Sequence, residues 1–327
     1  MTENFCFEVT QIEKRMRLDE FLFDKIRAVS RMHLRNLIAR EKCLLNEKRA
    51  TAGERLKVGD KIEIEVDLKA ETSMLPENIP LEIIYEDAEI LVVNKPAGML
   101  VHPTKGVKKG TLLNALSYHL NCKNTNSLDQ TKMTQESEFK IQNSEITNDE
   151  LRVPNPESQI LDPKFIRAGL IHRLDKQTSG LMVVSKTARA HRIISKQIQN
   201  RQVEKKYFAL VEGIIAEDSG AIVAPIYHNE QERIWQISDK GKPSESGFRV
   251  LERRADTTLL ELEPVTGRTN QLRLHLTHIG HPIIGDTIYG GRAFSRLCLH
   301  AYRLCFRHPN GNQRLEFETK LPNDFLS

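Results

Sequence analysis

The sequence has no long apolar run and no cysteine pattern typical of a cross-linked or zinc-binding protein. No stretch approaches the roughly 20 apolar residues that a helix needs to cross a bilayer. The first residues, MTENFCFEVT, lack the basic region and apolar core of a secretory signal, so we expect the chain to stay where it is made. The five cysteines are odd in number and never spaced as CxxC: Cys6, Cys43, Cys122, Cys298 and Cys305. This distribution argues against a disulfide framework and a structural zinc site, and it favours a reducing cytoplasm.

The composition is that of an ordinary globular protein, with 39% hydrophobic and 28% charged residues. A chain of 327 residues is long for one domain, and we expect two domains of unequal size. Positive charge is concentrated near the N-terminus, where residues 10–61 hold 14 Lys and Arg against 8 Asp and Glu, whereas the remainder carries a net charge of −2. Such a surplus suits a polyanionic partner, although a solvated helix face has the same composition.

Residues 15–66 have the pattern of a small α/β module. The stretch RMHLRNLIAREKCLL predicts an amphipathic helix, whose apolar face is marked by Leu34, Leu37 and Ile38. Arg31 and Arg35 are four positions apart and therefore share another face of this helix. The sequence LKVGDKIEIEV (56–66) then predicts a turn followed by an alternating strand. Two helices followed by a small antiparallel sheet are expected.

Strands and helices alternate from about residue 81 onward, which favours an α+β domain with a mixed, mostly antiparallel sheet and flanking helices. In residues 84–103 we expect a strand, a Pro-Gly turn and a second strand. The segment 204–215 is β-branched and aromatic and predicts a central strand. After the Gly267 turn we expect a helix with one apolar face, made of Leu272, Leu276 and Ile279, and with Gly280 at the C′ position.

Residues 121–163 differ from the rest of the chain. They are rich in Asn, Gln, Ser, Thr and acidic residues, they contain no glycine, and Phe139 is their single aromatic residue. Such a composition buries too little apolar surface to offset chain entropy. We expect a flexible insertion within the second domain.

The stretch GLIHRLDKQTSGLM (169–182) places one carboxylate, Asp175, between two apolar runs. Burial would raise the pKa of this carboxyl unless a cation compensates. Arg273, in the helix expected after the TGR turn, is a candidate, because a bidentate guanidinium would keep Asp175 ionised in a dry pocket. An Asp–Arg pair that only fastens two strands has the same charges, so charge alone leaves both interpretations open.

Three motifs, in this order, resemble the catalytic signatures of the RluA family of pseudouridine synthases: HRLDKQTSGL (172–181), KKYFALVEG (205–213) and VTGRTNQLRLH (265–275). Three further stretches are similar to that family: NKPAGMLVHP (94–103), GHPIIGDTIYGG (280–291) and LHAYRLCFRHP (299–309). The resemblance covers nearly all of residues 81–309 outside the insertion. It implies that residues 80–327 form a catalytic domain that isomerises specific uridines of structured RNA to pseudouridine.

The N-terminal segment resembles the S4-type RNA-binding domain, in RLDEFL (17–22), SRMHLRNLIAREKCLLNEK (30–48) and LKVGDKIEIEV (56–66). The resemblance implies a small α/β S4-like domain at residues 12–70. It also implies that Arg31 and Arg35 contact RNA phosphates, together with Lys42.

The RluA resemblance assigns roles to five residues of the second domain. Asp175 is the essential acid, Arg273 keeps it ionised, and Tyr207 stacks on the uracil or helps remove the C5 proton. Arg173 fills the space of the nucleotide that leaves its stack, and Leu272 walls the base pocket. By residue type alone, Tyr207 and Leu272 would equally suit a core and Arg173 a surface phosphate contact.

A lone acid is chemically sufficient for this reaction. A glycoside hydrolase needs two carboxyl groups because one must protonate a poor leaving group. Uracil leaves as a delocalised anion and needs less help. One ionised Asp can attack ribose C1′ or remove a proton from C2′, and the sequence leaves both routes open.

The sequence departs from the family pattern at two positions. Asn270 stands where the TGRTHQ pattern has His, and Gln177 follows HRLDK where an acid is common. We expect neither to touch Asp175, Tyr207 or Arg273, and so we expect altered hydrogen bonding nearby rather than lost activity.

Three other functions are compatible with parts of this sequence. A noncatalytic RNA-binding protein would not need Asp175, Tyr207 and Arg273, and a hydrolase would need a second carboxylate that these motifs lack. A metalloenzyme would have to use ligands from the region HLTHIGH and beyond, namely His275, His278, His281 and Asp286. We favour structural roles for these histidines and expect no metal and no cofactor. The expected partner is RNA, with large-subunit rRNA preferred and tRNA as the alternative, and we expect a cytoplasmic monomer that does not engage a membrane.

Overall fold

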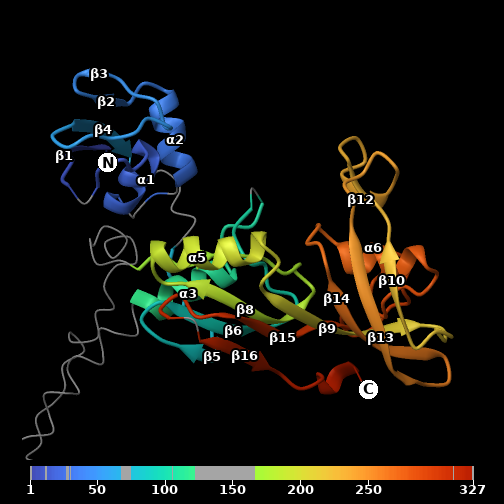
Figure 1. Ribbon diagram of the computed structural model, residues 1–327. Helices are drawn as coiled ribbons and strands as arrows, with labels where there is room; N and C mark the ends of the chain where they lie inside the picture. Colours follow the sequence, from blue (N-terminus) through green and yellow to red (C-terminus); the bar gives the residue numbers. More distant parts are fainter. Residues whose placement is uncertain are drawn as a thin grey trace, which may run out of the picture. The chain divides into compact units, whose positions relative to one another are not determined.

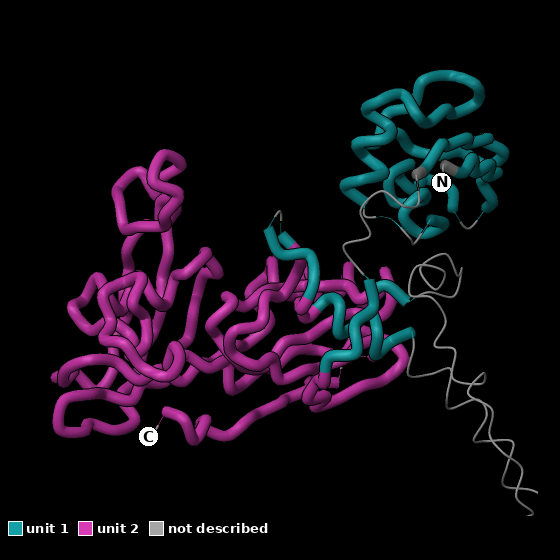
Figure 2. The backbone as a smooth tube through the Cα atoms, turned by 180° about the vertical axis from the view of Figure 1, so that it is seen from behind, with its two compact units in different colours: residues 1–79, 104–109, 113–167 teal, residues 80–103, 110–112, 168–327 magenta. Residues whose placement is uncertain are grey.

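The structure is a computed structural model that describes residues 2–11, 13–26, 29, 31–67, 75–104, 106–121, 166–311 and 313–325 (Figure 1). The insertion expected at 121–163 lies, except for Asn121, outside the described residues. The chain divides into two compact units (Figure 2): residues 1–79, 104–109 and 113–167, and residues 80–103, 110–112 and 168–327. No described helix has the length and apolar character needed to span a membrane.

The N-terminal part of the first unit contains two helices and a four-stranded sheet with the order β1-β4-β2-β3. Its elements are β1 (Thr2–Glu8), α1 (Leu18–Lys25), α2 (Arg31–Ala39), β2 (Cys43–Leu45), β3 (Lys48–Arg49) and β4 (Lys61–Asp67). The two helices and the strand at β4 confirm the expected elements, and the alternating Ile62, Ile64 and Val66 are all buried. Strand β1 was not predicted. It pairs antiparallel with β4 along its whole length.

The second unit is built on a ten-stranded sheet whose main path runs β10-β13-β14-β9-β15-β8-β6-β5. Its strands are β5 (Glu82–Glu86), β6 (Ile90–Lys95), β7 (Gly169–Leu170), β8 (Ser179–Ser185), β9 (Glu204–Glu212), β10 (Ser219–Val223), β13 (Glu245–Arg253), β14 (Thr257–Pro264), β15 (Leu299–Arg307) and β16 (Arg314–Glu318). A separate hairpin joins β11 (Ile226–Asn229) and β12 (Ile234–Ile237). All ladders of the large sheet are antiparallel except β8 with β15, which confirms the expected mixed, mostly antiparallel sheet.

Two helices of the second unit pack on the large sheet (Figure 1). Helix α5 (Ala188–Gln199) contacts β8 and β15, and helix α6 (Gln271–His278) contacts β13 and β14. Helix α3 (Leu112–Asn121) belongs almost entirely to the first unit, and a short 3-10 turn, η2 (Asn323–Phe325), follows the last strand.

Two expectations for the second unit were wrong. No strand follows the Pro-Ala-Gly turn: residues 96–103 form a loop, and the partner of β6 is the preceding strand β5. In α6, Leu272 and Leu276 are buried as expected, but Ile279 is exposed, because the helix ends at His278 and the chain turns away there. Gly280, with φ +83°, follows this end and confirms the expected C′ glycine.

The parallel contact between β8 and β15 depends on Gly180. It lies opposite Ala301 in the ladder and has φ +123°. A Cβ built on Gly180 would lie 2.3 Å from the carbonyl oxygen of Ala301, so no other residue fits without moving the backbone. This close approach fixes the start of β8, immediately after the loop that carries Asp175.

Gly180→Ala should therefore destabilise the protein by about 2 kcal/mol or more, since it combines a strained φ with a backbone clash. Urea unfolding of the full chain measures this loss. Gly247→Ala is the matched control in β13, where an added Cβ has no neighbour closer than 3.8 Å. Equal stabilities of the two variants would contradict the role given to the close approach.

Candidate active site

A cavity of about 330 Å³ lies in the second unit, bordered by the loop 171–178, strand β9 and the start of α6. The structure brings together in its lining all five residues that the sequence singled out in this domain: Arg173, Asp175, Tyr207, Leu272 and Arg273. Asp175 is the only carboxylate among the described residues that line the cavity.

Asp175 is held in a tight bend between β7 and β8. The backbone N–H of Thr178 donates to its carbonyl oxygen at 3.2 Å, and the neighbouring Leu174 and Thr178 are buried. The Asp175 side chain keeps 25% of its surface exposed, into the cavity that it lines. The Thr-Ser-Gly sequence after Asp175 thus serves to turn the chain sharply into β8.

Arg273 is engaged mainly by another acid. Its Nε and Nη2 donate to the two carboxylate oxygens of Asp286 at 2.7 and 2.6 Å, a bidentate pair in which both side chains are buried. Its Nη1 lies 3.9 Å from Oδ2 of Asp175. The expected bidentate pairing of Arg273 with Asp175 is therefore wrong. The almost fully buried Asp286 takes the bidentate geometry, and Asp175 receives an ionic contact without a hydrogen bond.

Two more side chains fix the Arg273 guanidinium. It lies over the ring of Tyr289 at 4.8 Å from the centroid, a cation–π contact, and its Nη1 donates to Oδ1 of Asn270 at 3.3 Å. Asn270 also donates through Nδ2 to the Tyr289 hydroxyl at 2.9 Å. The expectation that Asn270 touches none of the catalytic trio was wrong. Its φ of +55° is one that asparagine tolerates well, and this places its side chain against Arg273.

The charges around Asp175 oppose one another. Burial raises the pKa of its carboxyl, Arg273 and Arg173 lower it, Asp286 raises it and Lys95 lowers it. The net direction is upward, because desolvation and the second acid outweigh the cations.

Lys95 was missed by the sequence analysis. It is fully buried at the end of β6, and its Nζ donates to the carbonyl oxygens of Pro96, Met99 and Lys176 at 2.8, 2.9 and 3.2 Å. Burial lowers its pKa to about 8, opposed by the attraction of Asp175. Because Lys176 follows Asp175 in the chain, this ammonium anchors the acid's loop to β6. A lysine at the end of the apolar run ILVVNK was the available signal.

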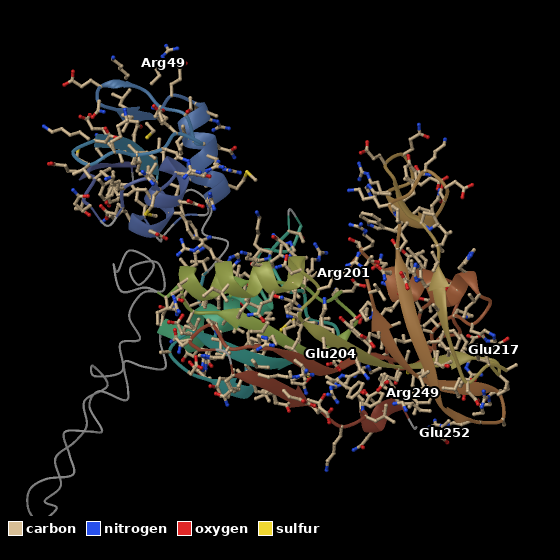
Figure 3. All side chains as sticks on the ribbon, viewed as in Figure 1. Arg49, Arg201, Glu204, Glu217, Arg249 and Glu252 are labelled. Atoms are coloured by element: carbon tan, nitrogen blue, oxygen red, sulfur yellow. The ribbon has the colours of Figure 1, made fainter. Side chains whose placement is uncertain are left out.

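Neighbouring side chains of β9 lie on opposite faces of the strand, and only one of these faces borders the cavity. Tyr207 is buried and lines the cavity, and burial followed by the charge of Asp175 raises the pKa of its phenol, which therefore stays protonated. The adjacent Lys206 points to the other face, where it contacts Glu261 at 3.2 Å. Glu261 is also contacted at 3.1 Å by Arg249, whose place on β13 is labelled in Figure 3. Only one face of the strand serves the cavity.

Two of the three histidines considered as metal ligands have other partners. The ring Nε2 of His275 lies 3.1 Å from the carbonyl oxygen of Ala224, and Nδ1 of His281 lies 2.8 Å from that of Glu212. Within the described part of the chain, no three His, Cys, Asp or Glu side chains are grouped so that they could hold a metal ion.

Arg31 and Arg35, the other two predicted site residues, lie on α2 of the first unit. Both contact the carboxylate of Asp19, with Nε to Oδ2 distances of 3.0 and 2.6 Å. Lys42 pairs with Glu65 at 2.6 Å. Arg31 and Arg35 thus share one face of α2 as expected. Both are held by Asp19, an acid that the sequence analysis did not single out.

Comparison with known proteins decides the family. Residues 89–278 match the family model described as RNA pseudouridylate synthase. The chain belongs to this family. The chain is 40% identical to the ribosomal large subunit pseudouridine synthase D of Pseudomonas aeruginosa over an alignment of 287 residues. This alignment covers 82% of this chain and 77% of that protein.

Other relatives agree. An uncharacterized RNA pseudouridine synthase of Bacillus subtilis is 34% identical over 316 residues, covering 95% of this chain and 92% of that protein. The fold is that of the human RNA pseudouridylate synthase domain containing 4, with a TM-score of 0.51 and 22% identity over 75% of this chain and 90% of that one. The protein is therefore an isomerase that acts on RNA and converts uridine to pseudouridine.

For a pseudouridine synthase that needs an ionised Asp175, activity should be present above the folded pKa of this residue and lost as pH falls through it. Because that pKa is raised, the acid limb of kcat/KM should lie above the ordinary Asp value of 3.8. Asp286→Asn removes a buried negative charge and should shift this limb to lower pH. It should also lower kcat by on the order of 10- to 100-fold, because Arg273 loses its bidentate anchor.

Asp256→Asn provides the control for this pH profile. Asp256 is exposed and pairs with Arg292, so the substitution makes the same charge change away from the cavity. Its profile should match that of the wild type. An acid limb that stays in place in Asp286→Asn would show that Asp286 does not influence Asp175.

Proposed function

We propose that this pseudouridine synthase modifies specific uridines of large-subunit ribosomal RNA, with Asp175 as the essential acid. The observation that carries the assignment of Asp175 is its position: among the described residues that line the cavity it is the sole carboxylate, and it lies 3.9 Å from the guanidinium of Arg273. Asp286, the second acid nearby, is 1% exposed and fully occupied by Arg273, so it cannot serve as the second carboxyl of a hydrolase.

The reaction breaks the bond between ribose C1′ and uracil N1, turns the base and joins C1′ to C5. Asp175 acts in its ionised form, whether it attacks C1′ or removes the C2′ proton. Arg273 supplies positive charge without occupying both carboxylate oxygens. Tyr207 offers its ring for stacking on the base. In the product N1 carries the proton that C5 loses, and because the Tyr207 phenol is protonated, its hydroxyl can relay this proton only by giving up its own as it accepts.

The rim of the cavity suits a nucleotide that has left its stack. Arg173 is exposed beside Asp175, and its planar guanidinium can take the place of the departed base. Leu272, 7% exposed, forms an apolar wall for the uracil. Eversion costs roughly a few kcal/mol, which these contacts offset.

The N-terminal unit supplies RNA affinity in this proposal, as an S4-type domain. Its two helices and four-stranded sheet carry the basic surplus of residues 10–61. The side chains of Arg31 and Arg35 are 38% and 41% exposed and can therefore contact RNA phosphates.

We further infer a cytoplasmic monomer. The described cysteines, Cys6, Cys43, Cys298 and Cys305, are free thiols, as a reducing compartment requires.

Asp175→Asn should abolish pseudouridine formation in rRNA transcripts while RNA binding survives, because only the reacting charge is removed. Pseudouridine is measured in transcripts treated with the purified full-length protein, with and without a chelator. Asp218→Asn, an exposed acid in the loop before β10, is the control and should retain full activity. Residual turnover in Asp175→Asn would remove this residue from the chemistry, and release of free uracil by the wild type would indicate a hydrolase.

The RNA target is tested separately, in cells. Pseudouridines mapped with and without this protein should differ at specific positions of large-subunit rRNA, as the names of the relatives suggest. Sites lost only from tRNA would overturn the proposed target and leave the isomerase intact. An unchanged map would favour a noncatalytic RNA-binding protein.

A further inference from the structure

One buried carboxylate in the N-terminal unit is surrounded by three arginines. Asp19, in the first turn of α1, is 0% exposed. Its Oδ1 lies 3.1 Å from Nε of Arg17, which precedes the helix, and its Oδ2 lies 3.0 and 2.6 Å from Nε of Arg31 and Arg35 on α2. A single acid thus gathers guanidiniums from two separate segments of the chain.

The cluster has more positive charge than the acid requires. One bidentate arginine is enough to hold a buried carboxylate, as Arg273 does for Asp286. Around Asp19 there are three guanidiniums, and the only other acid in contact is Glu20, 3.2 Å from Nη2 of Arg31 within the described residues. A net positive charge therefore stays on the surface after the acid has been neutralised.

The way in which the arginines are held leaves their outer ends available. All three bind Asp19 through Nε, and their side chains are 38% to 41% exposed. Among the described residues, the terminal nitrogens of Arg17 and Arg35 have no hydrogen bond or ion pair to another side chain. The pKa of Asp19 is lowered to about 2, because the three arginine hydrogen bonds outweigh the burial that raises it, so the acid stays charged at any physiological pH.

We propose that Asp19 is a positioning residue that fixes Arg17, Arg31 and Arg35 as a preorganised receptor for RNA backbone phosphates. This inference rests on the RNA-binding role proposed above for the N-terminal unit, and it adds to that role Arg17 and the acid that orders the three side chains. A free arginine carries about 2 kcal/mol of rotamer entropy, part of which is lost on binding. Fixing the guanidiniums in advance lowers this cost, and their planar forks match phosphate oxygens.

The decisive variant is Asp19→Asn. Binding by net positive charge alone and binding by arginines that Asp19 positions predict opposite changes in its RNA affinity. The substitution raises the net charge by one, so a patch that works only by charge would bind RNA more tightly. If Asp19 positions the arginines, the variant should bind a labelled RNA hairpin on the order of tenfold more weakly, with a rise in KM that exceeds any fall in kcat. Glu47→Gln makes the same charge change at an exposed turn of the same unit and should not weaken binding.

Individual arginines are then compared through the salt dependence of binding, measured between about 50 and 200 mM salt. Arg17→Gln should weaken binding as much as Arg31→Gln or Arg35→Gln, and each should reduce the slope of log K against log salt by about 1. An Arg17→Gln variant with wild-type affinity and slope would remove Arg17 from the receptor. Displacement of the RNA by polyglutamate at equal charge concentration would show that the receptor is for acidic peptides instead.

Asp19→Asn affinity equal to or above that of the wild type overturns the positioning role, provided that thermal unfolding shows a folded N-terminal unit. If the variant does not fold, Arg17→Lys decides, because lysine keeps the charge and lacks the fork: unchanged affinity overturns the proposal and weaker binding supports it. Pseudouridine formation by the wild type is scored separately. Its absence would refute the proposed isomerase, whereas tighter binding by Asp19→Asn in an active enzyme would refute only this inference.

Discussion

The arrangement of the candidate site depends on how one guanidinium is divided between two acids. Arg273 donates from Nε and Nη2 to Asp286, while its remaining nitrogen, Nη1, donates to Asn270 and lies 3.9 Å from Asp175. A bidentate contact with Asp175 would have stabilised its charge but engaged both oxygens of the acid that we propose to react. The buried Asp286 accepts that contact instead. Asp175 therefore gains the field of a cation while its lone pairs stay free for the substrate.

This division has an electrostatic consequence for Asp175. Desolvation and the charge of Asp286 raise its pKa, whereas Arg273, Arg173 and Lys95 lower it. A carboxylate whose charge is only partly compensated is a stronger base or nucleophile than one in a tight ion pair. The position of this group must then be held by something other than its side chain. The hydrogen bond from Lys95 to the carbonyl oxygen of Lys176, together with the close approach of Gly180 to β15, holds its loop through the main chain.

The sequence predicted the members of the site better than their contacts. The strand and helix periods placed Tyr207 on a central strand and Leu272 and Arg273 on the helix after the TGR turn, and the motifs singled out Arg173 and Asp175; all five line the cavity. The partner of Arg273 was predicted wrongly because two acids, Asp175 and Asp286, have the same charge and a linear pattern does not rank their distances. Lys95 was missed because a buried lysine bonded to carbonyls looks, in sequence, like the polar end of a strand.

Local errors in the fold have equally specific causes. The segment 96–103 contains apolar residues that suit a strand. However, β6 already pairs with β5 along one edge and with β8 along the other, so neither edge is left for this segment. Ile279 has the spacing of the apolar helix face. However, the helix ends at His278, just before Ile279 and Gly280, and the Ile279 side chain is exposed. Strand β1 alternates only weakly in hydrophobicity, and its pairing with β4 supplies what its own sequence does not signal. Strand pairing decided the first and third cases, whereas the local helix end at Gly280 decided the second.

The two units use the same pair of chemical groups in opposite proportion. At the cavity one arginine serves two acids, which leaves the Asp175 carboxylate only partly neutralised, as its proposed role as base or nucleophile requires. Around Asp19 one acid serves three arginines, which leaves positive charge at the surface, as a phosphate backbone requires. In both places the most buried acid, Asp286 or Asp19, is the one whose charge is fully matched, because an unmatched charge is least tolerable where water is excluded. The proposed functional groups are accordingly the more exposed members of each cluster, and the buried acid determines where they are held.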